Sequence, residues 1–186
     1  VYLAVSERAR ALKSSDSKEL VATAAEQEKE LLTKAEQAFN AAIQLKGDYL
    51  PAHYYLAATY ERQGRLQDAA ARMVALRNNS PSDVGLGFQL SQLLMRLKRY
   101  DLAKEELERL VKINPNYSNG LWYLASLYEL DRDRDKAIEL VGKVVENNPN
   151  NESAKDRLRR LQAGETTTTL PDPIQASQAP STAADE

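Results

Sequence analysis

Residues 84–117 read VGLGFQLSQLLMRLKRYDLAKEELERLVKINPNY, and the same order of residue types stands on both sides of this stretch. Three prolines close successive stretches, at Pro81, Pro115 and Pro149, and their spacings are equal, since 115 − 81 = 34 and 149 − 115 = 34. The other columns that keep this register are Leu56, Leu90 and Leu124; Ala57, Ser91 and Ala125; Tyr60, Leu94 and Tyr128; Ala69, Ala103 and Ala137; Met73, Leu107 and Val141; and Leu76, Leu110 and Val144. A period shared by so many columns indicates a chain built from repeats.

Each period contains two helical patterns. In the quoted stretch the first apolar face is formed by Leu90, Leu93, Leu94 and Leu97. A break at Lys98-Arg99 separates it from a second face, formed by Leu102, Ala103, Leu107, Leu110 and Val111. The second helix ends at Pro115, because proline cannot continue a helix. We therefore predict three helix hairpins, at 50–83, 84–117 and 118–151.

The repeated pattern resembles the tetratricopeptide repeat. It has a small residue after Leu, an aromatic residue three positions on, an Ala that starts the second helix and a closing Pro. The resemblance implies an all-α fold, a right-handed α-solenoid of helix hairpins. The Trp that this family carries early in the first helix is missing, since His53, Gly87 and Leu121 stand in that column.

The N-terminal part, residues 1–49, is predicted to form an irregular unit of the same kind. A short helix is expected at 2–13. A long helix is expected at 18–46, a stretch that contains no Gly and no Pro. The alternative for the second stretch is an ordinary hairpin with helices at 17–29 and 31–46.

The C-terminal part is predicted to hold a capping helix and a tail. In residues 152–163, Ala154, Leu158 and Leu161 line one face and charged residues line the other, as a terminal unit requires. Residues 164–186 hold three of the seven prolines and no Lys, Arg or aromatic residue. Such a composition cannot bury enough apolar surface to order itself, so we expect a disordered tail.

Composition argues against several functions. The net charge is −2, without a clustered basic face, so nucleic acid is not an expected partner. The chain has no Cys and one His, His53, which we expect to pack at a hairpin interface, so neither a metal nor another cofactor is expected. The alternating acids Asp131, Asp133 and Asp135 lack the Gly and Glu of a calcium loop. The charge runs at 26–30 and 156–160 are interpreted as solvated helix faces. No acid–base or nucleophile constellation predicts an enzyme.

The resemblance also implies where a partner binds. In tetratricopeptide arrays the first helices line a concave groove, and the residue after the Trp column points into it. These residues are Tyr54, Phe88 and Trp122, and the further groove positions are Ala58, Gln92 and Ser126; Glu61, Met95 and Glu129; and Arg62 and Arg96. Three aromatic side chains along a groove suit an extended peptide, especially one that contains Pro or Leu. The alternative is that these aromatic side chains pack between successive first helices.

The predicted function is a scaffold that binds a protein or peptide. The carboxylate clamp of this family needs Lys and Asn in the groove columns, so binding of an acidic C-terminal peptide is not expected. The chain begins at Val1 with apolar residues, which are either the first turns of an amphipathic helix or the end of a membrane helix. The chain contains no stretch of 18 apolar residues, so none of its segments is expected to span a bilayer.

Two alternatives concern the chain's surroundings. The first is a soluble appendage of a larger bacterial membrane or cell-envelope protein, because the arrangement resembles the repeat tails of O-antigen ligase or polymerase-like proteins. The second is a groove occupied by the chain's own tail, at 170–174, a proline-containing segment of the sort that an aromatic groove accepts. Both a cytoplasmic and a cell-envelope location are compatible with the sequence.

Overall fold

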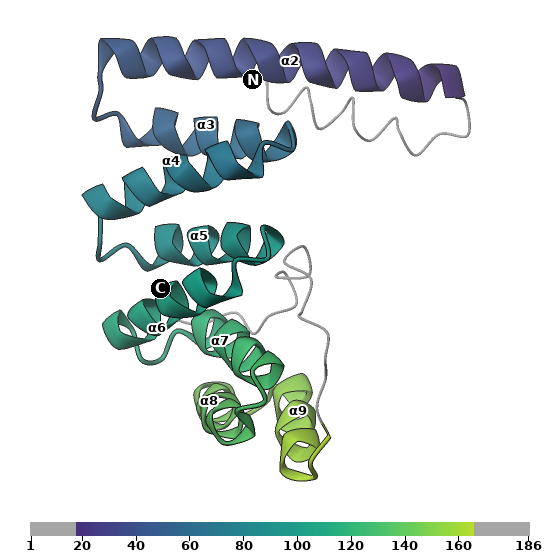
Figure 1. Cartoon of the computed structure of the whole chain (residues 1–186), viewed down its shortest axis with the longest axis vertical. Coiled ribbons are helices and arrows are strands. Elements are labelled where there is room, and N and C mark those ends of the chain that lie inside the picture. The colour runs from purple at the N-terminus through teal and green to yellow at the C-terminus, as the bar shows by residue number, and fades with distance from the viewer. Residues whose placement is uncertain (1–17, 166–186) are drawn as a thin grey trace. The chain divides into compact units, whose positions relative to one another are not determined.

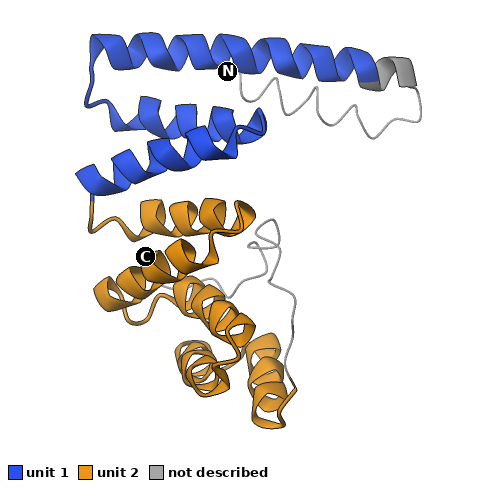
Figure 2. Ribbon diagram, in the orientation of Figure 1, with its two compact units in different colours: residues 1–80 blue, residues 81–186 orange. Residues whose placement is uncertain are grey.

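The computed structural model describes residues 18–165, and these form eight α-helices and no strand. The chain divides into two compact units, residues 1–80 and 81–186, which are described separately (Figure 2). In both units, helices that follow one another in sequence pack as antiparallel neighbours (Figure 1). The predicted all-α fold of sequential helix hairpins is confirmed.

Unit 1 contains a long helix and one hairpin. Helix α2 covers Lys18–Leu45, α3 covers Leu50–Arg62 and α4 covers Leu66–Asn79. A single helix therefore occupies the stretch for which the sequence favoured one long helix, and its N-terminal part extends beyond the α3–α4 turn (Figure 1). Glu36 of α2 accepts hydrogen bonds from Gln63 at 2.9 Å and Arg65 at 3.0 Å, which fasten the α3–α4 turn to α2.

Unit 2 contains two hairpins and a terminal helix. The first hairpin is α5, Val84–Arg96, with α6, Tyr100–Ile113. The second is α7, Ser118–Leu130, with α8, Arg134–Asn147, and α9, Glu152–Gln162, packs on α8. Asp83 and Asn151 cap α5 and α9 by accepting backbone N–H bonds, at 3.0 Å and 2.9 Å.

The repeated columns form the core. The Leu column and the small residues beside it are buried in every repeat, as are the Ala that starts each second helix and the large residue one turn before its end. These are Leu56, Leu90 and Leu124; Ala57, Ser91 and Ala125; Ala69, Ala103 and Ala137; and Leu76, Leu110 and Val144. Small side chains allow the two backbones of a hairpin to approach, and the large side chains fill the space around them.

The Trp column is filled differently in each repeat, which explains its departure from the family pattern. His53 bonds to the Gly47 carbonyl through Nε2 at 2.7 Å, and its Nδ1 lies 3.1 Å from Arg72 Nη1. Because Arg always donates, Nδ1 is the acceptor and the ring proton lies on Nε2. At Gly87, even a Cβ atom would lie 2.5 Å from Leu110 Cδ2 and 2.7 Å from Glu106 Oε1, so a larger residue would have to push these side chains aside. Leu121 is fully buried.

The turn inside each hairpin recurs at the same position of every repeat. Gly64, Lys98 and Arg132 have positive φ values of 77°, 58° and 63°. The next residue donates its N–H to the carbonyl five positions back, as in a Schellman motif: Arg65 to Tyr60, Arg99 to Leu94 and Asp133 to Tyr128. Two of the three turns therefore hold a non-glycine residue in the left-handed region, where its Cβ is strained.

We expect Lys98→Gly to stabilise the protein. Relief of left-handed strain outweighs the greater freedom of glycine in the unfolded chain, so the free energy of unfolding should rise by about 0.5–1 kcal/mol. Urea unfolding followed by circular dichroism measures this change. Gly64→Ala, at the equivalent turn of unit 1, should act in the opposite direction. A lower unfolding free energy for Lys98→Gly would contradict the account.

Candidate partner-binding surface

In unit 1, the predicted groove position Tyr54 is open to solvent. Its side chain is 36% exposed and contacts the ring of Tyr55 edge-on, with centroids 5.5 Å apart. Tyr55 is 46% exposed and stacks on Phe39 of α2 at 5.6 Å. We call Tyr54 and Tyr55 the aromatic pair. Tyr55 is not among the predicted groove positions, although its position beside Tyr54 and its large aromatic ring are a signal in the sequence.

The other predicted positions in unit 1 lie along the same helix. Ala58, Glu61 and Arg62 follow Tyr54 at helical spacings and are all partly exposed. Arg62 also lines a cleft of about 470 Å³ between α2 and the end of α3. Its lining residues are Ala25, Glu28, Lys29, Leu32, Thr33, Arg62, Gln63 and Arg65. One face of α3 therefore carries an aromatic surface near its start and a polar cleft at its end.

In unit 2, the equivalent aromatic residue is closed off. Phe88 is 8% exposed and makes edge contacts with Tyr117 and Tyr123, at centroid distances of 5.4 Å and 5.5 Å. Packing between successive first helices, the alternative considered for this column, therefore applies to Phe88. Met95 is buried as well, Gln92 is partly exposed and Arg96 is exposed.

The last three predicted positions are covered by the capping helix. Arg157 of α9 lies over the Trp122 ring, with its guanidinium carbon 4.3 Å from the ring centroid. The same side chain donates to Glu129 Oε1 at 2.9 Å and to Ser126 Oγ at 2.8 Å. Ser126 and Glu129 are buried. Trp122 stays partly exposed, but in this conformation a partner reaches neither Ser126 nor Glu129 without displacing Arg157.

Both charge runs are mostly exposed, as the sequence indicated, but each contains one buried charged residue. Residues 156–160 were expected to form a solvated face, yet Arg157 is buried, because α9 turns this side chain toward α7. Residues 26–30 were also expected to be solvated, yet Glu28 is buried. A signal for Arg157 was present in the sequence: it lies three residues after Ala154 and four before Leu161, on the apolar stripe of α9.

Another aromatic residue of unit 2, Tyr128 of α7, packs against charged side chains of the neighbouring helices. Tyr128 Oη donates to Glu108 Oε1 at 2.6 Å, and the ring lies 4.7 Å from Lys136 Nζ and 5.6 Å from Lys104 Nζ. The hydrogen bond to Glu108 and burial raise the pKa of Tyr128 to about 12. The phenol is therefore neutral at physiological pH and holds α6, α7 and α8 together.

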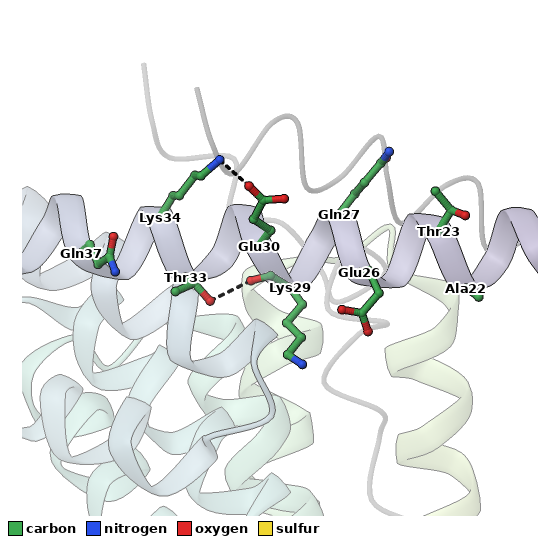
Figure 3. Close-up of a pocket in the computed structure, with 9 residues that line it drawn as sticks. All are labelled: Ala22, Thr23, Glu26, Gln27, Lys29, Glu30, Thr33, Lys34 and Gln37. Atoms are coloured by element: carbon green, nitrogen blue, oxygen red, sulfur yellow. Dashed lines mark hydrogen bonds and ion pairs between the residues drawn. The ribbon is translucent and has the colours of Figure 1, made fainter.

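A surface hollow of about 820 Å³ runs along one side of α2, and its described lining residues include none of the predicted groove residues. Figure 3 shows its polar contacts, which stay within the helix: Lys34 bonds to Glu30, and the Thr33 hydroxyl donates to the Lys29 carbonyl. Within the described residues, no group of His, Cys, Asp and Glu side chains is arranged to hold a metal ion. The hollow is the exposed face of a single helix and brings together no catalytic set.

Comparison with known families decides what the hairpins are. Two tetratricopeptide repeat models match residues 62–120 and 120–151. Residues 62–151 are tetratricopeptide repeats. Repeats of this family generally serve as protein–protein interaction modules and are typically non-catalytic.

A relative and two solved structures carry similar repeats. Transcription factor tau subunit sfc4 of Schizosaccharomyces pombe is 30% identical over 121 residues, which are 64% of this chain and 12% of sfc4. YrrB, a tetratricopeptide repeat protein with an unusual peptide-binding site, superposes with a TM-score of 0.58 at 19% identity and covers 76% of this chain and 77% of its own. The first repeat domain of Spaghetti (RPAP3), bound to an HSP90 peptide, has a TM-score of 0.55 at 19% identity, with coverages of 62% and 91%.

These similarities support the fold and cover only part of the longer relative. The structures share the fold at low identity, and this chain spans about an eighth of the length of sfc4. The comparisons give no support to the resemblance to O-antigen ligase-type proteins. No helix among residues 18–165 is both long and apolar enough to cross a membrane. The helix expected at 2–13 and the tail segment 170–174 lie outside the described residues, so both stay predictions.

Proposed function

We propose that this chain is a non-enzymatic scaffold that binds an extended peptide, or an extended segment of a partner protein, through the aromatic pair of α3. The observation that carries the proposal is the exposure of Tyr54 and Tyr55 side by side on α3, directly before residues 62–151, which match a family that generally binds proteins. Tyrosine offers a large rigid surface at a low cost in conformational entropy, which is why it is frequent among the residues that dominate interfaces.

The surroundings of the aromatic pair favour an extended ligand with apolar and polar groups in turn. Phe39 supports Tyr55 from behind, so the pair keeps its orientation without a partner. A Pro or Leu side chain stacks on such rings, while Glu61, Arg62 and the cleft further along α3 supply hydrogen-bonding groups. YrrB has a peptide-binding site and the repeat domain of Spaghetti binds a peptide, which supports a peptide as the class of ligand, although the acidic HSP90 peptide of Spaghetti differs from the apolar ligand proposed here.

Replacing both tyrosines by alanine should abolish binding. Peptides selected from a random library on the wild-type chain should lose at least about 30-fold in affinity on Tyr54→Ala/Tyr55→Ala, the loss expected when a residue pair at the centre of an interface is removed. Fluorescence anisotropy of labelled peptides measures the Kd.

The matched control is Ile113→Ala, which removes an exposed apolar side chain from unit 2. It should bind the same peptides as tightly as the wild type does. Circular dichroism should show the same helicity for all three proteins. Peptides that bind the double variant with unchanged Kd would refute the proposal.

A further inference from the structure

Helix α9 begins in the register of a fourth repeat. Ala154, Leu158 and Leu161 stand one repeat period after Gly120, Leu124 and Leu127, so α9 takes the place of a first helix. The column of small residues, however, holds Arg159, whose side chain is 72% exposed. Helix α9 thus packs with one face only, through the buried residues Ala154, Arg157 and Leu161.

The face of α7 beneath α9 forms a guanidinium site. We call Trp122, Ser126 and Glu129, which lie at i, i+4 and i+7, the arginine pocket. Arg157 Nε and Nη2 both donate to Glu129 Oε1, Nη2 donates to Ser126 Oγ, and Nη1 donates to the Trp122 carbonyl at 3.1 Å. The indole ring covers the flat face of the guanidinium.

These contacts recognise arginine specifically. A planar group with donors in a fork is needed to reach a carboxylate, a hydroxyl and a carbonyl at once, and lysine offers a single point charge instead. Burial lowers the pKa of Arg157, an effect that the Glu129 carboxylate opposes. A capping helix does not need such selectivity for arginine. An apolar residue of similar volume covers the end of an array about as stably as a buried ion pair does.

Helix α9 also depends on tertiary contacts for its place. It has 11 residues, and an isolated helix of that length is marginal in water, so its place depends on tertiary contacts. A four-residue link, 148–151, joins it to α8. Helix α9 is the last helix of the described residues and packs through one face only, and elements at the end of an array open at a lower free-energy cost than those inside it. Opening of α9 uncovers the arginine pocket.

We propose that α9 is an internal ligand of the arginine pocket, and that a partner protein displaces it with a helix of the pattern Ala-x-x-Arg-x-x-x-Leu. The pattern is that of the three buried residues of α9, which places the small residue, the arginine and the leucine on one face. The seated helix shows the chemistry that the pocket accepts, and the buried Glu129 carboxylate selects a cationic group. This second binding surface is independent of the aromatic pair.

The test uses a synthetic peptide of residues 150–164, NNESAKDRLRRLQAG, and the fluorescence of Trp122, the sole tryptophan of the chain. The full-length Arg157→Ala variant, whose own α9 no longer fills the pocket, should bind the peptide saturably. The wild-type chain should bind it at least about tenfold more weakly, because its tethered α9 competes at an effective concentration near millimolar.

Two altered peptides provide the matched comparison. A peptide with Arg157→Ala should lose binding to the variant protein, whereas one with Arg159→Ala, at the exposed position, should bind unchanged. Equal binding of both peptides, no binding to a folded Arg157→Ala protein, or equally tight binding to wild type would each overturn the proposal. Tyr54→Ala/Tyr55→Ala in the Arg157→Ala protein should leave binding of the 150–164 peptide intact. Failure of the arginine-pocket proposal can therefore be told apart from failure of the aromatic-pair proposal.

Two further measurements keep the proposal testable if Arg157→Ala does not fold. Hydrogen exchange on the wild-type chain should show α9 amides exchanging at least about 100-fold faster than those in the middle of α7, and equal protection would refute an opening α9. Light scattering should show a monomer. A wild-type dimer would identify α9 of a second copy as the occupant and overturn the proposal of a foreign helix.

Discussion

Glu129→Ala should destabilise unit 2 by about 3 kcal/mol, because it leaves the Arg157 guanidinium buried without its carboxylate. Both side chains of this pair are almost fully buried, so water does not replace the lost partner. The loss lies at the lower end of the range for a broken buried pair, because Arg157 reaches water when α9 undocks. Urea unfolding, followed by circular dichroism and by Trp122 fluorescence, measures it.

The control for this variant is Glu152→Ala. Glu152 also forms an ion pair, with Lys155 at 2.8 Å, but its side chain is 78% exposed. Its removal should leave the unfolding free energy unchanged within error, because solvent screens an exposed pair. If the two variants had equal stability, the arginine pocket would contribute nothing to the docking of α9.

Leu107→Ala should cost about 2–5 kcal/mol of unfolding free energy, the range for removal of a fully buried leucine side chain from a packed core. Leu107 of α6 is completely buried and belongs to one of the columns that recur in every repeat. The variant loses the transfer free energy of the removed methyl and methylene groups and leaves a cavity that the helices only partly fill. Chemical denaturation with urea gives the value.

Leu102→Ala, in the same helix, is the comparison. Leu102 is 44% exposed, so its replacement should change the unfolding free energy by less than about 0.5 kcal/mol. The sequence pattern placed Leu102 on the same apolar face as Leu107, so a similar loss for both variants would contradict the exposed position of Leu102 in the structure.

The repeat register predicted most of the fold. The columns that contain Leu56, Ala69 and Leu76 in the first repeat recur in the second and third repeats, and all of their members are buried. The hairpin turns were equally visible, at Gly64 and at the break near Lys98. These features are local, since a helical period places the same positions on the same face in each repeat.

The candidate site was predictable only in part. Tyr54 and Phe88 occupy the same column, yet Tyr54 is exposed and Phe88 is buried. The difference arises from the neighbours: Tyr117 and Tyr123 enclose Phe88, whereas Tyr54 borders the exposed ring of Tyr55. The position of a residue in the repeat indicates the direction in which its side chain leaves the helix. It does not indicate which side chains of the next helix pack against it.

By itself, the sequence determined the helices and their pairing into hairpins, because these depend on spacings within a single repeat of regular helix. Only the tertiary structure decided which of the predicted groove positions are exposed. Arg157 lies 28 residues after Glu129 and seals the last repeat, and no local pattern pairs these two charges. Burial is a property of contacts between helices, and a charged side chain on an amphipathic helix reveals its partner only when the helices are packed.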